Sequence, residues 1–168
     1  WSSDVCSSDL ADPGASRSGE VSSRSFAAYL DTCVLVSLFH GDSGYPAAAA
    51  WLASATSQTL WISHWVLLEF ANATALRMRR AELPASKAVE LNQMFEAFRQ
   101  ERLALLEPRG QDFLLAREWI QRDSASGLRA ADALHLALVQ RQDLLLVSAD
   151  QAMARAAAVL GIQTLLLG

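Results

Sequence analysis

Short apolar runs alternate with longer segments of helical periodicity along most of the chain. The runs FAAYLD and LLLV are apolar at nearly every position, which is typical of strands buried on both faces of a parallel sheet. TLWIS, RLALLE and IQTLLL show the same pattern in a weaker form. The pattern therefore predicts strands at residues 26–31, 59–63, 102–107, 144–147 and 162–167.

The segments between these runs have the spacing and the end signals of helices. Pro46 stands in the first turn of one segment, Ser63 is a candidate N-cap of the next, and Gly161 follows the last. The predicted helices are residues 46–57, 65–80, 84–100, 111–122, 129–141 and 151–160. Because helices and strands alternate, we predict an α/β fold: a three-layer α/β/α sandwich with a central, mostly parallel sheet and helices on both faces.

Residues 1–25 differ from the rest of the chain. They repeat SSD, are rich in Ser, Asp and Gly, and have no periodicity, so we interpret them as a non-native or disordered leader. No internal repeat interrupts residues 26–168, which we expect to form a single domain. The leader holds four acidic and two basic residues; without it, 14 acidic and 12 basic residues remain, a net charge of −2. That small excess neither supports nor excludes a nucleic-acid partner.

The composition excludes several classes of protein. With 52% hydrophobic and 19% charged residues the chain has the composition of an ordinary globular protein. No apolar run approaches the roughly 20 residues of a membrane-spanning helix, so we expect no membrane association. Two cysteines are too few for a disulfide framework, and Cys33, in the apolar run TCVLVSLF, is expected to be a small buried hydrophobe.

Four carboxylates fall at positions that an α/β fold brings together. Asp31 closes the first predicted strand, Asp150 follows the strand LLLVS, and Glu69 and Asp132 lie near the starts of their helices. Residues at the carboxyl ends of strands and in early helix turns share one crevice, so all four should converge there. Clustered carboxylates repel one another unless a cation offsets them, and Mg²⁺ or Mn²⁺ prefers such oxygen ligands. An ion of this kind indicates phosphodiester hydrolysis.

Each of these residues also has a simpler interpretation. Asp150 fits a helix N-cap, Asp31 the start of a turn, and Glu69 a solvated helix position. Asp132 lies in RAADALHLAL, a helix apolar on nearly every side, where an unpaired charge would be costly. His135, one turn further on, is interpreted as a packed neighbour of the site and not as a metal ligand, because a hard-oxygen site does not require imidazole.

Other catalytic motifs fit the chain poorly. GDSG occurs in HGDSGYP, but a chymotrypsin-like protease is a β-barrel and this chain is rich in helix. Lys87 is the single lysine; it follows Ser inside a predicted helix, which excludes a phosphate-binding loop. Contacts to phosphate should therefore come from arginine, and Arg129, one turn before Asp132, is the best-placed candidate. A solvated or helix-capping arginine is the alternative.

The order of the motifs LDTCVLV, LLEFANA, AADALHLAL and VSADQAMARAA, followed by GIQTLLL, resembles the PIN-domain ribonucleases, and within them the VapC-type toxins of bacterial toxin–antitoxin pairs. The resemblance covers residues 26–168. It implies a PIN-like α/β/α sandwich and a cytoplasmic, Mg²⁺- or Mn²⁺-dependent endoribonuclease, with Asp31, Glu69, Asp132 and Asp150 as its acidic residues. Thr32 and Ser148 match neighbouring polar positions of the family, which more often has Thr where Ser148 stands.

The resemblance also implies a homodimer and a small antitoxin protein whose tail fills the cleft. The sequence leaves two alternatives open. One is a solitary PIN nuclease of RNA processing, since the acidic residues would be the same. The other is a domain that binds RNA or a protein partner without cutting, in which the acidic cluster holds only a structural ion.

Overall fold

Parallel strands in the order β3-β2-β1-β4-β5 form the central sheet. The computed structural model describes residues 27–122 and 127–168, so the leader predicted for residues 1–25 lies outside the described residues. The strands are β1 (Ala28–Leu30), β2 (Leu60–Ser63), β3 (Leu103–Leu106), β4 (Leu145–Ser148) and β5 (Thr164–Leu166). All five lie within the predicted strand segments or one residue beyond them.

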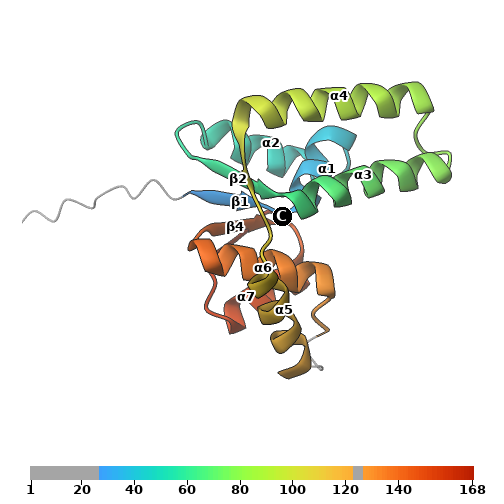
Figure 1. Ribbon diagram of the computed structural model, residues 1–168. Coiled ribbons are helices and arrows are strands. Elements are labelled where there is room, and N and C mark those ends of the chain that lie inside the picture. Colours follow the sequence, from blue (N-terminus) through green and yellow to red (C-terminus); the bar gives the residue numbers. More distant parts are fainter. Residues whose placement is uncertain (1–26, 123–126) are drawn as a thin grey trace, which may run out of the picture.

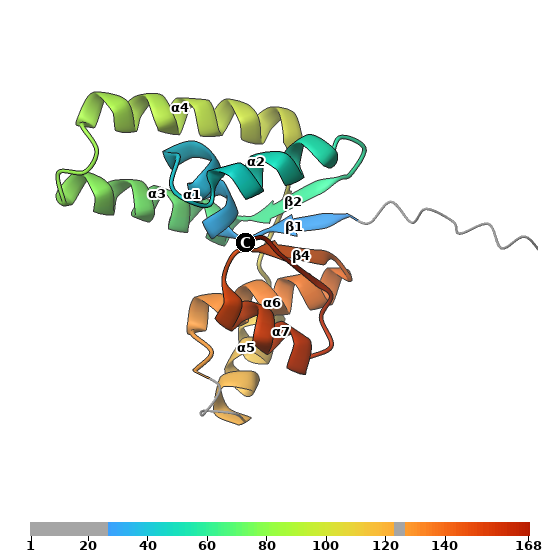
Figure 2. The same cartoon turned by 180° about the vertical axis from the view of Figure 1, so that it is seen from behind.

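Helices cover both faces of the sheet. They are α1 (Thr32–His40), α2 (Tyr45–Ser54), α3 (His64–Arg79), α4 (Ala85–Arg102), α5 (Gly110–Arg122), α6 (Ala130–Gln142) and α7 (Gln151–Val159). Helices α1 to α4 lie on one side and α5 to α7 on the other (Figures 1 and 2). Right-handed crossovers explain this division, because the chain moves from β1 toward β3 in one direction and then continues from β4 to β5 in the opposite direction. The predicted three-layer sandwich is confirmed.

The six predicted helices all form, but the sequence pattern missed α1. Its residues, TCVLVSLFH, are apolar at most positions, and such a run does not by itself distinguish a strand from a buried helix. The backbone of Asp31 is still extended (φ −68°, ψ 152°), and the helix starts at the next residue. It ends at Gly41, whose φ of 66° lies in the left-handed region that glycine adopts at no steric cost. Asp31 therefore stands at a direct strand-to-helix junction.

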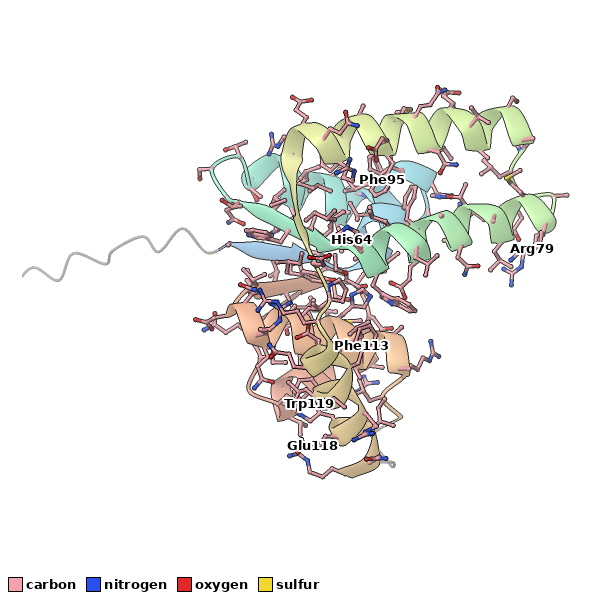
Figure 3. The ribbon with its side chains drawn as sticks, in the orientation of Figure 1. His64, Arg79, Phe95, Phe113, Glu118 and Trp119 are labelled. Atoms are coloured by element: carbon pink, nitrogen blue, oxygen red, sulfur yellow. The ribbon has the colours of Figure 1, made fainter. Side chains whose placement is uncertain are left out.

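Aromatic rings join α1 to the long α3–α4 hairpin. Phe95 points from α4 toward the other helices (Figure 3) and stacks on Phe70 of α3 with 4.0 Å between ring centroids. Phe39 of α1 meets both rings edge-on, at 5.8 and 5.5 Å. Such aromatic pairs contribute beyond the area they bury. They fix α3, which carries Glu69, against α1, which begins beside Asp31.

On the opposite face, α6 is the most deeply buried helix. Every residue from 133 to 139 is buried, as the apolar pattern of RAADALHLAL predicts. Its far end is tied to α5 by a buried ion pair: Arg141 Nε lies 2.7 Å from Asp112 Oδ1, and the Asp112 side chain is 1% exposed. Asp112 Oδ2 also accepts the backbone N–H of Arg109 at 2.7 Å. No helix of the described ranges is long and apolar enough to cross a membrane.

We predict that Asp112→Ala lowers the free energy of unfolding by about 3–5 kcal/mol, because it leaves the Arg141 side chain, which is only 12% exposed, without its carboxylate partner. Urea unfolding followed by circular dichroism measures the change. The matched control is Glu90→Ala, which removes the exposed pair of Glu90 with Lys87 (2.9 Å) and should cost less than about 1 kcal/mol. Equal losses for the two variants would contradict the structural role of the buried pair.

Candidate functional site

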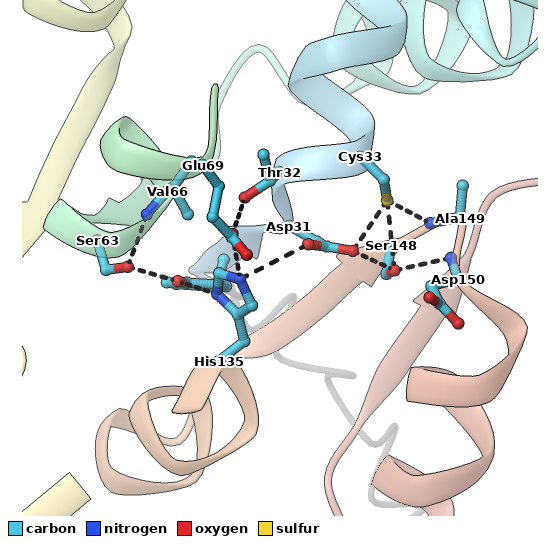
Figure 4. A network of polar contacts seen from close by, with 11 residues as sticks. Asp31, Thr32, Cys33, Ser63, Val66, Glu69, His135, Ser148, Ala149 and Asp150 are labelled. Atoms are coloured by element: carbon cyan, nitrogen blue, oxygen red, sulfur yellow. Dashed lines mark hydrogen bonds and ion pairs between the residues drawn. The ribbon is translucent and has the colours of Figure 1, made fainter. Parts of the chain in front are cut away.

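The carboxyl ends of β1 and β4 lie side by side and bring Asp31 next to Ser148. Leu30 pairs with Val147 in the sheet register, and the N–H of Asp31 donates to the carbonyl of Val147 at 3.0 Å. The Ser148 hydroxyl then donates to Asp31 Oδ2 at 2.6 Å (Figure 4). Both residues are buried. The carboxylate that closes the first strand is therefore held by a hydroxyl from the neighbouring strand.

The thiol of Cys33 is a second donor to Asp31. Its Sγ lies 2.9 Å from Asp31 Oδ2 and accepts the backbone N–H of Ala149 at 3.2 Å. Burial and the charge of Asp31 raise the pKa of this thiol to about 12, so it keeps its proton near neutral pH and donates it to the carboxylate. The expectation of a small buried hydrophobe is wrong: Cys33 is only partly buried, and its thiol is a polar partner of the site.

Asp150 opens α7 as an N-cap, as the simpler interpretation proposed. Its Oδ1 accepts the backbone N–H groups of Ala152 and Met153 at 2.6 and 3.0 Å. Its own backbone N–H donates to Ser148 Oγ at 2.9 Å, so Ser148 joins Asp150 to Asp31. Both capping bonds go to Oδ1, and Oδ2 has no hydrogen bond to the residues that the structure describes.

Asp132, in the first turn of α6, carries a charge that its surroundings disfavour. Burial raises its pKa above the usual value, and the negative charges of Asp150 and Asp31 raise it further. A hydrogen bond from the backbone N–H of Arg129, at the N-cap of α6, opposes part of the rise. These effects place Asp132 in the same electrostatic environment as Asp31 and Asp150.

Glu69 reaches the same edge from the second turn of α3, but other groups hold it. His135 Nε2 lies 2.8 Å from Glu69 Oε2, and the Thr32 hydroxyl donates to the same oxygen. Burial alone would raise the pKa of Glu69; the bonds from His135 and Thr32 outweigh that effect and leave the pKa below its usual value. The same His135 nitrogen lies 3.9 Å from Asp31 Oδ1, so it connects Glu69 to the aspartate cluster.

The residues that the sequence singled out thus meet at one edge of the sheet, with different surroundings. Asp31, Asp132 and Asp150 influence one another by charge, and Glu69 is linked to them through His135. Thr32 supports Glu69, and Ser148 supports Asp31. Arg129 is exposed at the start of α6, and its backbone N–H donates a hydrogen bond to the Asp132 carboxylate.

Two further residues lie behind the site: Tyr29, which the sequence analysis did not single out, and Ser63, which it named only as a helix cap. Tyr29 is fully buried in β1, and its hydroxyl lies 2.8 Å from both Ser63 Oγ and His135 Nδ1. A tyrosine in the middle of a strand buried on both faces requires a hydrogen-bond partner for its hydroxyl, which was the one available signal. Its partners are 34 and 106 residues away, too distant for the sequence to identify them.

The donor chemistry of this edge suits a hard divalent cation. Asp31, Asp132 and Asp150 offer carboxylate oxygens, and none of them has an ion pair with a lysine or arginine of residues 27–122 and 127–168. Within the same ranges, no group of three or more His, Cys, Asp or Glu side chains is arranged to hold one ion. The site therefore fits such an ion by charge and by type of oxygen, while the side-chain directions are not those of a complete ligand set.

We predict that Asp132→Asn stabilises the protein when divalent ions are chelated, by roughly 0.5 kcal/mol because water screens the half-buried group. The raised pKa means that ionised Asp132 opposes folding above that pKa, so the gain should be present at pH 7.5 and fade as the pH falls and Asp132 becomes protonated. Urea unfolding at pH 7.5 and 4.5 measures it, with Glu118→Gln, an exposed acid of α5, as control. A lower free energy of unfolding for Asp132→Asn than for the wild type at pH 7.5 would contradict this prediction.

Comparisons with known proteins agree with this architecture. The chain is similar to VapBC2 from Rickettsia felis bound to a promoter DNA fragment (TM-score 0.60, 17% identity, 84% of this chain and 99% of that chain). It is similar to VapC20 from Mycobacterium tuberculosis, a toxin that cleaves the sarcin–ricin loop (0.62, 21%, 77% and 95%). It is also similar to DNA-bound VapBC from Salmonella typhimurium (0.61, 16%, 83% and 97%).

At these identities the similarity shows a shared fold, and no curated protein matches the chain. The model of one family, the PIN domain, matches residues 28–159. That range includes both ends of the carboxylate cluster, from Asp31 to Asp150, and most of the chain. The chain therefore belongs to the PIN domain family.

Proposed function

We propose that this protein is a metal-dependent endoribonuclease, the toxin of a toxin–antitoxin pair. Membership of the PIN domain family and the fold shared with VapC20, a toxin that cleaves RNA, support a nuclease. The observation that carries the proposal is the charge at the sheet edge. Burial, and then the charges of Asp150 and Asp31, raise the pKa of Asp132, and no lysine or arginine of the described residues pairs with the three. A carboxylate whose pKa is raised by burial and by neighbouring carboxylates is a candidate functional group.

Asp31, Asp132 and Asp150 would hold Mg²⁺ or Mn²⁺, with Glu69 as the fourth acid. The bound ion would supply an activated nucleophile and offset the charge that develops on the phosphate oxygens during phosphodiester hydrolysis. Because Asp150 caps α7 through Oδ1, its Oδ2 is the oxygen that could serve as a ligand without breaking the cap. The carboxylates together would neutralise the ion while leaving its remaining positions for water and phosphate.

The other polar residues would keep these acids in position. Ser148 and Cys33 both donate to Oδ2 of Asp31, which leaves Oδ1 directed toward the His135 side of the site. Thr32 donates to Glu69 and so fixes the start of α1 against α3. None of these donors carries a positive charge, so they orient the carboxylates without removing the charge that a metal ion requires.

Binding of RNA would depend on local arginines, since the net charge of the chain is negative. Arg129 is exposed beside Asp132, which favours the interpretation that it contacts a phosphate near the scissile bond. A phosphate contact positions the strand but does not read its sequence. The target RNA would then be selected by groove shape and loops around this edge.

A small antitoxin protein and a homodimer belong to the same proposal, as does a cytoplasmic location. Several of the solved structures that share the fold are toxin–antitoxin complexes, among them the VapBC pairs of Rickettsia felis and Salmonella typhimurium. The present chain corresponds to nearly the full length of those matched chains. A partner that covers the carboxylate edge would explain how a cell tolerates such a nuclease.

We predict that the purified chain cleaves a pool of labelled RNA with Mg²⁺ or Mn²⁺ and stops cleaving when EDTA is added. Asp31→Asn and Asp132→Asn should each lower the rate constant by more than about 100-fold. Mutation of residues that only hydrogen-bond to metal ligands typically lowers activity by about 10–100-fold, and loss of a ligand itself should lower it further. Gel analysis of timed reactions gives the rates. Glu118→Gln, an exposed acid away from the site, is the matched control and should cleave at the rate of the wild type.

Two results would contradict this mechanism. Cleavage that persists in EDTA, or that survives in both aspartate variants, would exclude the metal-dependent route. RNA binding without turnover under every divalent ion tested would favour the non-cutting alternative, with the carboxylates serving a structural ion.

We predict that a small protein encoded by a short reading frame beside that of this chain co-purifies with it when the two are co-expressed. The complex should cleave RNA at least about tenfold more slowly than the free chain, because the partner's tail would cover the carboxylate edge. Light scattering should show the free chain as a dimer, at twice the 18.2 kDa of one copy. A chain that cleaves RNA but neither binds nor is slowed by such a partner would be a solitary PIN nuclease.

A further inference from the structure

A line of buried hydrogen bonds runs from the sheet to Glu69 without touching solvent. Ser63 is fully buried at the end of β2, where its Oγ accepts the N–H of Val66 and caps α3. Its hydroxyl contacts that of Tyr29, which contacts His135 Nδ1, each at a distance of 2.8 Å. His135 Nε2 in turn lies 2.8 Å from Glu69 Oε2 (Figure 4). His135 is 1% exposed. This line joins β2, β1, α6 and α3.

The line has one arrangement of protons that satisfies every group. An ionised carboxylate can only accept, so His135 Nε2 must donate to Glu69. A neutral ring with its proton on Nε2 accepts at Nδ1, so the Tyr29 hydroxyl donates there. The Tyr29 oxygen is then free to accept from Ser63, whose oxygen already accepts from Val66. Each donor faces an acceptor, and all the protons point toward Glu69.

The other two arrangements leave a group without a partner. With the proton on Nδ1 only, the lone pair of Nε2 would face the Glu69 carboxylate at 2.8 Å, and two acceptors would repel each other. With protons on both nitrogens, Tyr29 would have to donate to Ser63, and the Ser63 proton would find no acceptor among the described residues. Buried polar groups without partners are rare in folded proteins, which favours the neutral Nε2–H ring.

We propose that His135 is a positioning residue: Tyr29 holds it as the neutral Nε2–H tautomer, and that N–H fixes the direction of the Glu69 carboxylate. The role in catalysis rests on the proposed nuclease function. The geometry supports this role, because the bonds from His135 of α6 and Thr32 of α1 both reach Oε2 of Glu69, so the position of that oxygen is fixed from two helices at once. His135 would thus act through Glu69, and its buried ring would not reach the substrate.

Nitrogen-15 spectra of the full-length protein, labelled at histidine, test the tautomer without any need for activity. The Nδ1 and Nε2 shifts of a neutral imidazole differ widely between protonated and unprotonated nitrogens, so the Nε2–H ring has a distinct signature. His135 is assigned by comparison with His135→Gln. We expect Nε2 protonated and Nδ1 unprotonated at pH 7.5. Protonation of both nitrogens, or of Nδ1 alone, would overturn the proposal.

Tyr29→Phe tests the positioning role by removing only the hydroxyl that holds the ring. We expect a kcat for RNA cleavage lowered by about 10–100-fold, because the ring loses the bond that holds it at Nδ1. KM should change less than about threefold, because substrate contacts stay in place. The matched control is Thr74→Val, which removes another buried hydroxyl of α3, the one that lies 3.1 Å from His40 Nε2. Its kcat should equal that of the wild type.

The outcomes separate this inference from the proposed function. If the wild type cleaves RNA and Tyr29→Phe retains its kcat, Tyr29 does not hold the ring and the inference is wrong. If Tyr29→Phe fails to fold, His135→Gln replaces it: the glutamine amide can donate to Glu69 and should keep more activity than His135→Ala, and equal losses overturn the inference. If the wild type does not cleave RNA, the proposed function fails and the nitrogen spectrum alone decides whether Tyr29 holds His135 as described.

Discussion

Negative charge concentrated at the carboxyl ends of β1 and β4 is the constraint to which the surrounding structure responds. Among the described residues, the groups that donate hydrogen bonds to these acids are neutral: the Ser148 hydroxyl and the Cys33 thiol on Asp31, and the backbone amides of α7 on Asp150. Neutral donors orient a carboxylate but leave its charge, whereas a lysine or arginine would cancel it. The edge is therefore ordered and still negative, which is the condition a divalent cation requires.

Helix α6 holds Asp132 and His135 in fixed positions at this edge, because most of the helix is packed in the core. Its residues 133–139 are all buried, so the helix cannot rotate without breaking the packing on both sides. Asp132 and His135 lie three positions apart, which puts them on the same side of the helix. His135 links α6 to β1 by its hydrogen bond with Tyr29, and to α3 by its hydrogen bond with Glu69. His135, a polar residue in an otherwise apolar helix, therefore connects the helical layers on the two faces of the sheet.

The sequence predicted the sheet and six of the helices, because these follow from local periodicity. It also placed Asp31 and Asp150 at neighbouring strand ends, from the rule that parallel strands end at one edge. It did not predict α1, since an apolar run such as TCVLVSLF suits a strand and a buried helix alike. Nor did it predict the partners of the acids. The contact of Tyr29 with His135 spans 106 residues, and that of Ser148 with Asp31 spans 117, so only the folded chain brings them together.

The structural roles of the acids do not explain their charge. Asp150 caps α7 and Asp132 accepts a backbone N–H from Arg129, but an asparagine would make either bond with a neutral oxygen. For Asp132 the neutral residue would even be preferred, because burial and the neighbouring aspartates oppose its ionisation. A fold that keeps a charged oxygen where a neutral one would be more stable needs a reason outside its own packing. The proposed cation would supply that reason, because its positive charge would offset the negative charges of Asp31, Asp132 and Asp150.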